Sequence, residues 1–124
     1  MFQFIKQRIA SFKWAILGIK DLISHHPNAQ VHSMATLVVI PLAFYLGLSI
    51  VEWCLIVLCI VLVLAMEAMN SAVEYLADKI SPEHDPLIGK AKDIAAAAVL
   101  LSALGAAVVG LLIFVPKLYA LLLS

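Results

Sequence analysis

The sequence predicts an all-α membrane protein, with an N-terminal amphipathic helix followed by three membrane helices. Two observations predict this class. Hydrophobic residues make up 65% of the 124 positions and charged residues only 13%, far from the soluble average. Three long apolar segments also follow one another without a Gly/Ser-rich linker, so residues 1–124 form a single domain. The net charge of zero gives no basic excess for nucleic acid, which is not expected as a partner.

The first expected helix covers residues 1–24. Apolar residues recur there at steps of three and four, and lysines recur at steps of seven: Phe2, Ile5, Ile9, Phe12, Ile16, Ile19 and Ile23, with Lys6, Lys13 and Lys20. This pattern predicts an amphipathic helix that lies in the membrane interface. The repeated lysines argue against a cleaved signal peptide. Packing of this helix against the other helices inside the protein remains an alternative.

Three membrane helices are expected at about 31–51, 53–80 and 93–120. A span needs about 20 apolar residues, which the first and third segments supply. The second offers only about 14 before Glu67, or about 21 Å of helix. It therefore crosses the bilayer only if Glu67 lies inside the hydrocarbon or at its edge.

The basic residues are distributed unequally between the two ends of these helices. Lys6, Arg8, Lys13 and Lys20 precede the first span, Lys79, Lys90 and Lys92 lie between the second and third, and Lys117 alone lies on the other side. The positive-inside rule places the N-terminus and this second loop in the cytoplasm. Groups at that end of the second span would then meet cytoplasmic solutes, including ATP.

The second span carries polar residues on one face. At about 100° per residue, the positions that share this face are Glu67, Asn70, Ser71, Glu74 and Asp78. A charge at the bilayer centre costs about 2.5–3.5 kcal/mol on insertion scales, so such residues normally face a cavity, a partner or a pathway. This face is a candidate functional site, although Glu74 and Asp78 are also explained as solvated residues where the helix leaves the bilayer.

The segment after this span adds further charges at the same end: Glu83, His84, Asp85, Lys90, Lys92 and Asp93. Carboxylates beside lysines suit phosphoryl transfer, in which oxygen ligands hold Mg²⁺ and a cation neutralises phosphate charge. An ordinary small membrane protein presents similar residues at its helix ends. No GxxxxGK[ST] phosphate loop occurs, so a nucleotide would have to bind to helices.

Two segments carry a resemblance to a known family. EAMNSAVEYLAD (67–78) and the Lys92–Asp93 pair in GKAKDIAAAAVLL resemble the signature of the bacterial integral-membrane diacylglycerol kinases and undecaprenol kinases. The resemblance runs from Trp14 onward. It implies a lipid kinase of the bacterial inner membrane that transfers the ATP γ-phosphate to diacylglycerol or undecaprenol, with Mg²⁺, as a homotrimer. GLSIVEW (47–53) and SPE (81–83) are more similar to the undecaprenol kinase branch.

The resemblance also implies residue roles. Glu67 would be the general base, Glu74 would hold the metal, and Lys92 would meet the phosphates. Asn70 and Ser71 would contact the substrate, while Glu74, Asp78, Lys92 and Asp93 would bind ATP. Asn70 and Asp78 would also help to position the nucleotide and the metal.

The chain departs from the family pattern at His26, where most members carry a metal-binding glutamate. In HHPNAQVH (25–32), Asn28 and His32 match the pattern. Imidazole is a poor ligand for Mg²⁺, so His26 is a doubtful metal ligand. It would contact phosphate instead, or leave the metal with fewer carboxylates. The departure at His26 keeps open a catalytically silent family member with a structural or regulatory role. A small ion or proton pathway that uses Glu67 and Glu74 is a second, less favoured alternative.

Overall fold

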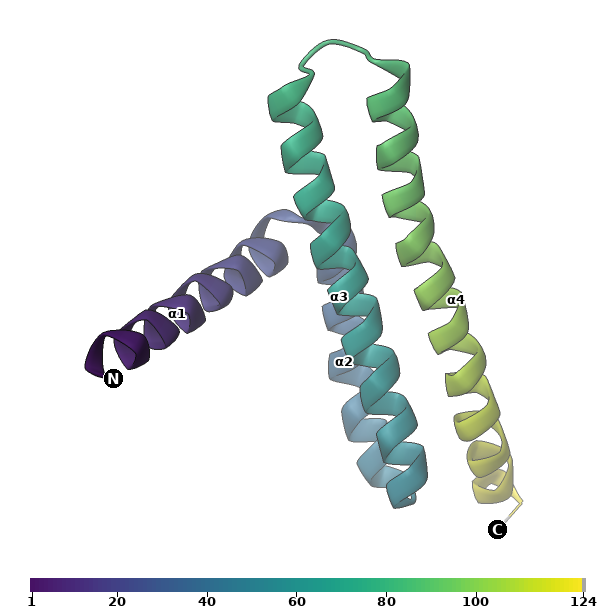
Figure 1. The fold of residues 1–124 in the computed structure, drawn as a ribbon. Coiled ribbons are helices and arrows are strands. Elements are labelled where there is room, and N and C mark those ends of the chain that lie inside the picture. The colour runs from purple at the N-terminus through teal and green to yellow at the C-terminus, as the bar shows by residue number, and fades with distance from the viewer. Residues whose placement is uncertain (124) are drawn as a thin grey trace.

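The computed structural model describes residues 1–123, which form four helices and no strand. They are α1 (Phe2–His25), α2 (Pro27–Tyr45), α3 (Ile50–Ile80) and α4 (Pro86–Leu122). Figure 1 shows α3 and α4 running antiparallel as a long pair, with α2 beside the lower half of α3. The predicted all-α class and the order of the helices are confirmed.

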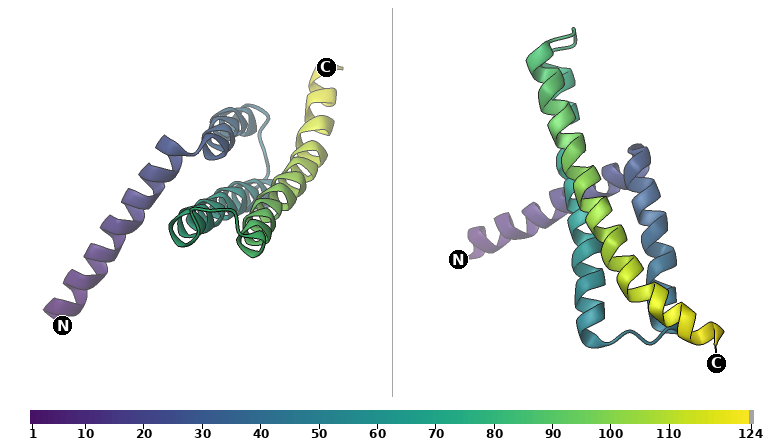
Figure 2. Two further views of the ribbon diagram at one scale, coloured as in Figure 1. Left: turned by 90° about the horizontal axis from the view of Figure 1, so that it is seen from above. Right: turned by 90° about the vertical axis from the view of Figure 1, so that its right-hand side faces the viewer.

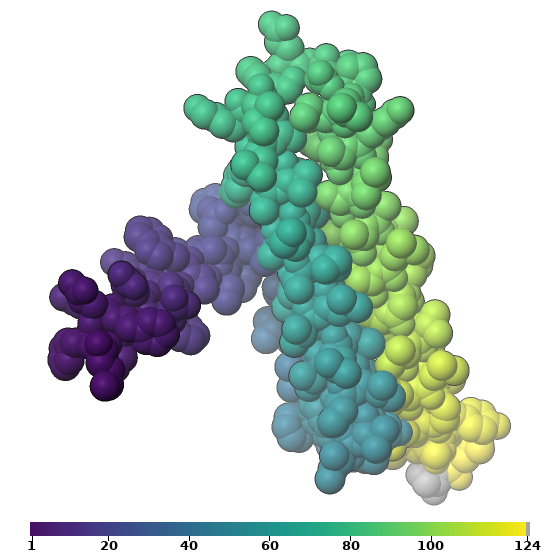
Figure 3. All heavy atoms as spheres, in the orientation of Figure 1, coloured from purple at the N-terminus to yellow at the C-terminus, as the bar shows by residue number. Residues whose placement is uncertain are grey.

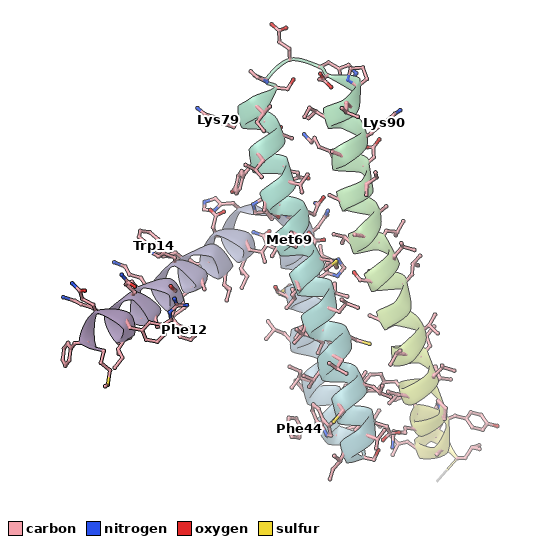
Figure 4. The ribbon with its side chains drawn as sticks, in the orientation of Figure 1. Phe12, Trp14, Phe44, Met69, Lys79 and Lys90 are labelled. Atoms are coloured by element: carbon pink, nitrogen blue, oxygen red, sulfur yellow. The ribbon has the colours of Figure 1, made fainter. Side chains whose placement is uncertain are left out.

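Helix α1 projects sideways from the other three helices (Figures 1 and 2). Residues 1–20 are all exposed, and Leu22 is the buried residue of the helix. The space-filling view shows the N-terminal part of α1 standing free of the bundle (Figure 3). Phe12 and Trp14 lie on this free part (Figure 4). Most of α1 therefore does not pack inside the chain, and its apolar side chains are available to a lipid interface.

The first predicted membrane helix was placed too late. It was expected at about 31–51, but α2 spans Pro27–Tyr45 and α3 begins at Ile50. Gly47 adopts a φ of 61°, a left-handed conformation that favours glycine and turns the chain. Ser49 and Glu52 then form a capping box that starts α3. The break was not predicted because Leu46 and Leu48 continue the apolar run on both sides of Gly47.

The last helix starts earlier than the expected residue 93. Asp85 Oδ1 accepts hydrogen bonds from the backbone N–H groups of Leu87 (2.8 Å) and Ile88 (3.1 Å). Pro86 follows at the first helical position, where its missing N–H costs nothing. The polar segment before Lys92 is thus helical, and one loop carboxylate, Asp85, has a structural role as a cap.

The apolar core lies at the end of the bundle away from the α3–α4 loop. Its buried residues are Ala43, Leu48, Ile56, Ile113 and Phe114. Lys117 Nζ pairs with Glu52 Oε2 at 3.2 Å at this end. Lys79 and Lys90 lie at the opposite end, beside the loop (Figure 4). The two ends of the α3–α4 pair are thus chemically different.

Two helices, α3 with 31 residues and α4 with 37, are long and apolar enough to cross a membrane. Only 17% of each apolar window is buried, whereas the core helix of a soluble protein buries most of its apolar surface. Helix α2 has 19 residues, which is long enough, but its polar beginning leaves it outside this group. The structure therefore supports a membrane protein with two clear candidate spans.

Candidate functional site

Three polar residues of α3 are buried, although most residues of the molecule are exposed. Glu67 is 1% exposed and is the largest fully buried side chain, and Asn70 and Ser71 are also buried. Glu67 Oε1, Asn70 Oδ1 and Ser71 Oγ have no hydrogen-bond partner within residues 1–123. Buried polar groups are normally paired, so unpaired ones point to a missing ligand or partner. The sequence predicted these three residues as one face.

Asn70 and Glu74 extend this face by one turn. Asn70 Nδ2 donates a hydrogen bond of 3.4 Å to Glu74 Oε1. The bond holds the half-buried carboxylate of Glu74 toward the same side of α3 as Glu67. Glu67, Asn70 and Glu74 thus lie together as expected.

Lys92 connects α4 to the end of this face. Its Nζ lies 3.0 Å from Asp78 Oδ1, which brings together two residues predicted for ATP binding. The Lys92 and Asp78 side chains are 40% and 70% exposed, so water screens the pair and leaves the cation accessible to an anion. Asp93 is exposed beside Lys92.

His32 is the site residue to which the sequence analysis assigned no role. Its Nε2 atom lies 3.4 Å from Glu67 Oε1, and its side chain is 25% exposed. This distance allows electrostatic attraction, but the two groups are not aligned as a hydrogen bond. The match of His32 to the family pattern was the one signal in the sequence that could have marked it as a site residue. Its contact with Glu67 could not be predicted, because the contact depends on how α2 packs against α3.

His26 lies in a second polar cluster, with Asp21, His25 and Tyr75. Tyr75 Oη donates to Asp21 Oδ2 at 2.7 Å, and His26 Nε2 lies 3.0 Å from Tyr75 Oη. Because the hydroxyl proton points to Asp21, His26 Nε2 is the donor to Tyr75. That nitrogen is then unavailable to a metal, which leaves only Nδ1 for the metal role predicted for His26.

The same cluster changes the ionisation of Asp21. The hydrogen bond from Tyr75 lowers the pKa of Asp21 below its ordinary value of 3.8, partial desolvation opposes this, and nearby His25 and His26 lower it further. His25 Nδ1 lies 3.0 Å from Asp21 Oδ1. Asp21 and Tyr75 were not predicted as site residues, because no local sequence pattern pairs residues this far apart.

Two cavities flank the polar face of α3. The first, of about 280 Å³, lies between α2, α3 and α4 and has His32 among its mainly apolar lining. The remaining lining residues are Ala35, Thr36, Val39, Ile56, Cys59, Ile60, Val63, Leu64, Ala103, Ala106, Ala107, Gly110 and Phe114. The second, of about 330 Å³, lies between α1 and α3 and includes Asp21, His26, Ser71 and Tyr75. Glu67 lines neither cavity itself, but its Oε1 atom lies 3.4 Å from Nε2 of His32, which lines the first cavity.

The carboxylates of the site suit a metal ion whose remaining ligands come from the substrate. No group of three or more His, Cys, Asp or Glu side chains within residues 1–123 is arranged to hold a metal ion. Mg²⁺ is commonly held by one or two carboxylates together with phosphate oxygens. Glu74, held by Asn70, supplies a carboxylate of this kind, so the residues present fit Mg²⁺ delivered with a nucleotide.

The fold and the site define a small helical membrane protein with a buried carboxylate where an apolar cavity meets a charged helix end. The family model for prokaryotic diacylglycerol kinase matches residues 13–114. The chain belongs to the prokaryotic diacylglycerol kinase family.

Curated relatives cover most of the chain. The undecaprenol kinase of Bacillus subtilis (strain 168) is 41% identical over 108 residues, which are 87% of this chain and 88% of the relative. The diacylglycerol kinase of Haemophilus influenzae is 34% identical over 94 residues, covering 76% and 80% of the two chains. The diacylglycerol kinase of Escherichia coli (strain K12) is 28% identical over 95 residues, covering 77% and 76%.

Proposed function

We propose that this protein is a lipid kinase that transfers the γ-phosphate of ATP to the hydroxyl of a membrane lipid alcohol. The observation that carries the proposal is the place of Glu67, a fully buried carboxylate with an unpaired oxygen beside an apolar cavity. The family and the names of the relatives support this reaction class. Of the two acceptors, undecaprenol is favoured by the 41% identity to an undecaprenol kinase.

The acceptor side of the reaction follows from the first cavity. An apolar tail that enters between α2, α3 and α4 is shielded from water, and its hydroxyl reaches the polar end beside His32. Glu67 Oε1 is free to accept that hydroxyl proton while the oxygen attacks phosphorus. Holding the two reacting groups together in this way removes much of the entropic barrier. Asn70 and Ser71 would contact the acceptor beside Glu67.

The phosphate side follows from α4 and the end of α3. Lys92 would turn from Asp78 to the phosphates, and Asp78 and Asp93 would bind the nucleotide. Glu74, oriented by Asn70, would hold Mg²⁺. Nδ1 of His26 would be the one nitrogen of that side chain left to contact the metal, because Nε2 is bonded to Tyr75. When bound, Mg²⁺ neutralises the charge that develops on the phosphate oxygens.

The orientation in the membrane is part of the proposal. Helices α2, α3 and α4 would each cross the inner membrane, with the N-terminus and the α3–α4 loop in the cytoplasm. At 1.5 Å per residue, the 19 residues of α2 are about 28 Å long, close to the hydrocarbon thickness. Helix α1 approaches α3 near the height of Met69 (Figure 4). If α1 lies in the interface, Glu67 stands at the edge of the hydrocarbon, with ATP on one side and lipid on the other.

A homotrimer would complete the site, as the family resemblance implies. The unpaired oxygens of Asn70 and Ser71 are consistent with groups contributed by a neighbouring subunit or by substrate. The small residues Ser102, Ala106 and Gly110, four positions apart on α4, suit close helix packing. Ser102 is buried, and the other two line the first cavity. Native mass spectrometry in detergent would show the subunit number.

Phosphate transfer to two acceptors in parallel tests the function. Purified protein in lipid would receive ATP labelled at the γ-phosphate and Mg²⁺, with diacylglycerol or undecaprenol as acceptor. Labelled lipid that depends on the acceptor supports the kinase, and the faster acceptor identifies the branch. Folded protein that labels neither lipid, with Mg²⁺ or Mn²⁺, would contradict the proposal in favour of a silent member. Proton flux in proteoliposomes without ATP would favour the pathway protein.

A further inference from the structure

Among the four histidines, His32 alone contacts the buried carboxylate of α3. The side chain of His25 is 69% exposed and pairs with Asp21. His26 forms a hydrogen bond with Tyr75, and His84 is exposed in the loop. Only His32 combines partial burial, a 3.4 Å approach to Glu67 and a place in the wall of the first cavity.

The packing of α2 fixes the position of His32. Ala29, His32, Thr36, Val39 and Ala43 follow one another at steps of three and four, so they share one face of the helix. Ala29 and Ala43 are completely buried at the two ends of this stripe, which permits close approach of α2 to its neighbours. His32, Thr36 and Val39 line the first cavity. His32 thus occupies a packed position of the helix, and its imidazole is held toward α3.

We propose that His32 is the positioning residue of Glu67 and the exit for the proton that Glu67 takes from the acceptor. The proposal rests on the lipid kinase function and extends it. In the transfer, the acceptor O–H bond breaks and its oxygen bonds to the γ-phosphorus, while the bond to the departing ADP oxygen breaks. The proton goes to Glu67, which must lose it before the next turnover.

Burial prevents Glu67 from returning this proton directly to water. Its side chain is 1% exposed, whereas that of His32 is 25% exposed. An imidazole whose Nε2 is unprotonated lies close enough to receive the proton after a small movement. The imidazolium formed in this way donates Nε2–H to Glu67 Oε1, which orients the ionised carboxylate for the next attack, and it becomes neutral again by losing a proton to solvent.

The electrostatic surroundings of the pair are simple. Glu74 and His26 also act electrostatically on Glu67, and both come from the polar side of the site. Helix α4 contributes Ala103, Ala106, Ala107, Gly110 and Phe114 to the first cavity, none of which titrates. Cys59 of α3 is the other titratable residue of the lining besides His32. A change in the pH dependence of turnover on replacing His32 can therefore be assigned to this pair.

The test uses two variants of the full-length protein in lipid. His32→Ala is expected to lower kcat by about 10²-fold, as a misplaced catalytic group does, with the KM for ATP unchanged and with partial rescue by added imidazole. His32→Gln preserves size and a donor but does not titrate. It should retain the KM for lipid and lose one limb of the wild-type pH profile of kcat. His25→Ala is the matched control and should behave as wild type.

The outcomes separate this inference from the function on which it rests. Wild-type protein that transfers no phosphate would overturn the lipid kinase function. Active wild-type protein with unchanged kcat and pH profile in both His32 variants would overturn the role of His32 alone. Loss of activity without imidazole rescue and without a changed pH profile would show a structural role and also overturn it. An infrared shift of the Glu67 carboxylate band in His32→Gln, absent in His25→Ala, would show the contact without any assay of activity.

Discussion

Tyr75 and Asp21, which lie 54 positions apart in the sequence, are joined by a hydrogen bond of 2.7 Å. This contact connects the C-terminal half of α1 to α3, and His26 at the start of α2 joins it through Tyr75. Three helices therefore meet at one phenol. The second cavity lies beside this cluster, and the cluster holds α1 at its angle to the bundle.

Tyr75→Phe should loosen α1 without unfolding the membrane helices. The change removes the donor to Asp21 and leaves the ring in place, and α1 has few other buried residues to hold it. Hydrogen exchange of residues 15–25 in lipid should become faster, while exchange in α3 and α4 stays the same. Tyr119→Phe, an exposed tyrosine near the end of α4, is the matched control. Unchanged exchange in Tyr75→Phe would show that other contacts hold α1.

Acid should release α1 in the wild-type protein. The pKa of Asp21 is lowered below 3.8, chiefly by the hydrogen bond from Tyr75. A group whose pKa is lowered in the folded state stabilises that state above its ordinary pKa, and the effect disappears as pH falls through the lowered value. The contribution of Asp21 to the docking of α1 should therefore be constant down to about pH 4 and weaken below it. The distance between spin labels on α1 and α3 measures this, and Asp21→Asn should abolish the transition.

Glu67→Gln should lower phosphate transfer by about 10²- to 10⁴-fold, because it removes the proposed general base and preserves the shape of the side chain. The midpoint temperature of thermal unfolding should stay the same or rise, because burying an uncharged amide costs less free energy than burying a carboxylate. Glu52→Gln is the control, because it lies at the opposite end of α3, where glutamine still completes the capping box with Ser49. Turnover near the wild-type rate in Glu67→Gln would remove Glu67 from the proposed role.

Lys92→Met should reduce activity far more than stability. The Lys92–Asp78 pair is exposed, and pairs of this kind contribute about 0–1 kcal/mol to folding. Loss of the cation that is proposed to bind the phosphates should lower kcat by about 10²- to 10³-fold. Lys90→Met, an exposed lysine two positions earlier on α4, should leave both quantities near wild type. Equal activity of the two variants would contradict the assignment of Lys92.

The helices and their polar face could be predicted, because both depend on periodicity within one helix. Glu67, Asn70 and Glu74 share a face through simple helical geometry, and the structure places them together. The helix ends near Tyr45 and Pro86 were missed because they depend on turn and capping residues, Gly47 and Asp85 among them, within apolar or polar runs that look continuous. The contacts of His32 with Glu67 and of Tyr75 with Asp21 were missed because they depend on how separate helices pack.

His26→Glu should restore the carboxylate that most family members carry and strengthen the binding of Mg²⁺. Carboxylate oxygen is a better ligand than imidazole for this hard cation, so the Mg²⁺ concentration for half-maximal turnover should fall. The change also has a cost at α1. A carboxylate cannot donate to Tyr75, and it would lie close to Asp21, whose Oδ2 is now 3.8 Å from His26 Nε2. Faster hydrogen exchange in residues 15–25 should therefore accompany the tighter metal binding.

His25→Glu separates the metal effect of His26→Glu from a general effect of charge. Both variants add a carboxylate near Asp21, but the His25 side chain is largely exposed and bonds Asp21 from within α1. His25→Glu should loosen α1 and leave the Mg²⁺ requirement unchanged. If the two variants shift the Mg²⁺ requirement equally, or if neither shifts it, position 26 does not face the metal. The Tyr75 contact would then be the main role of His26, and Glu74 would hold the ion with substrate oxygens alone.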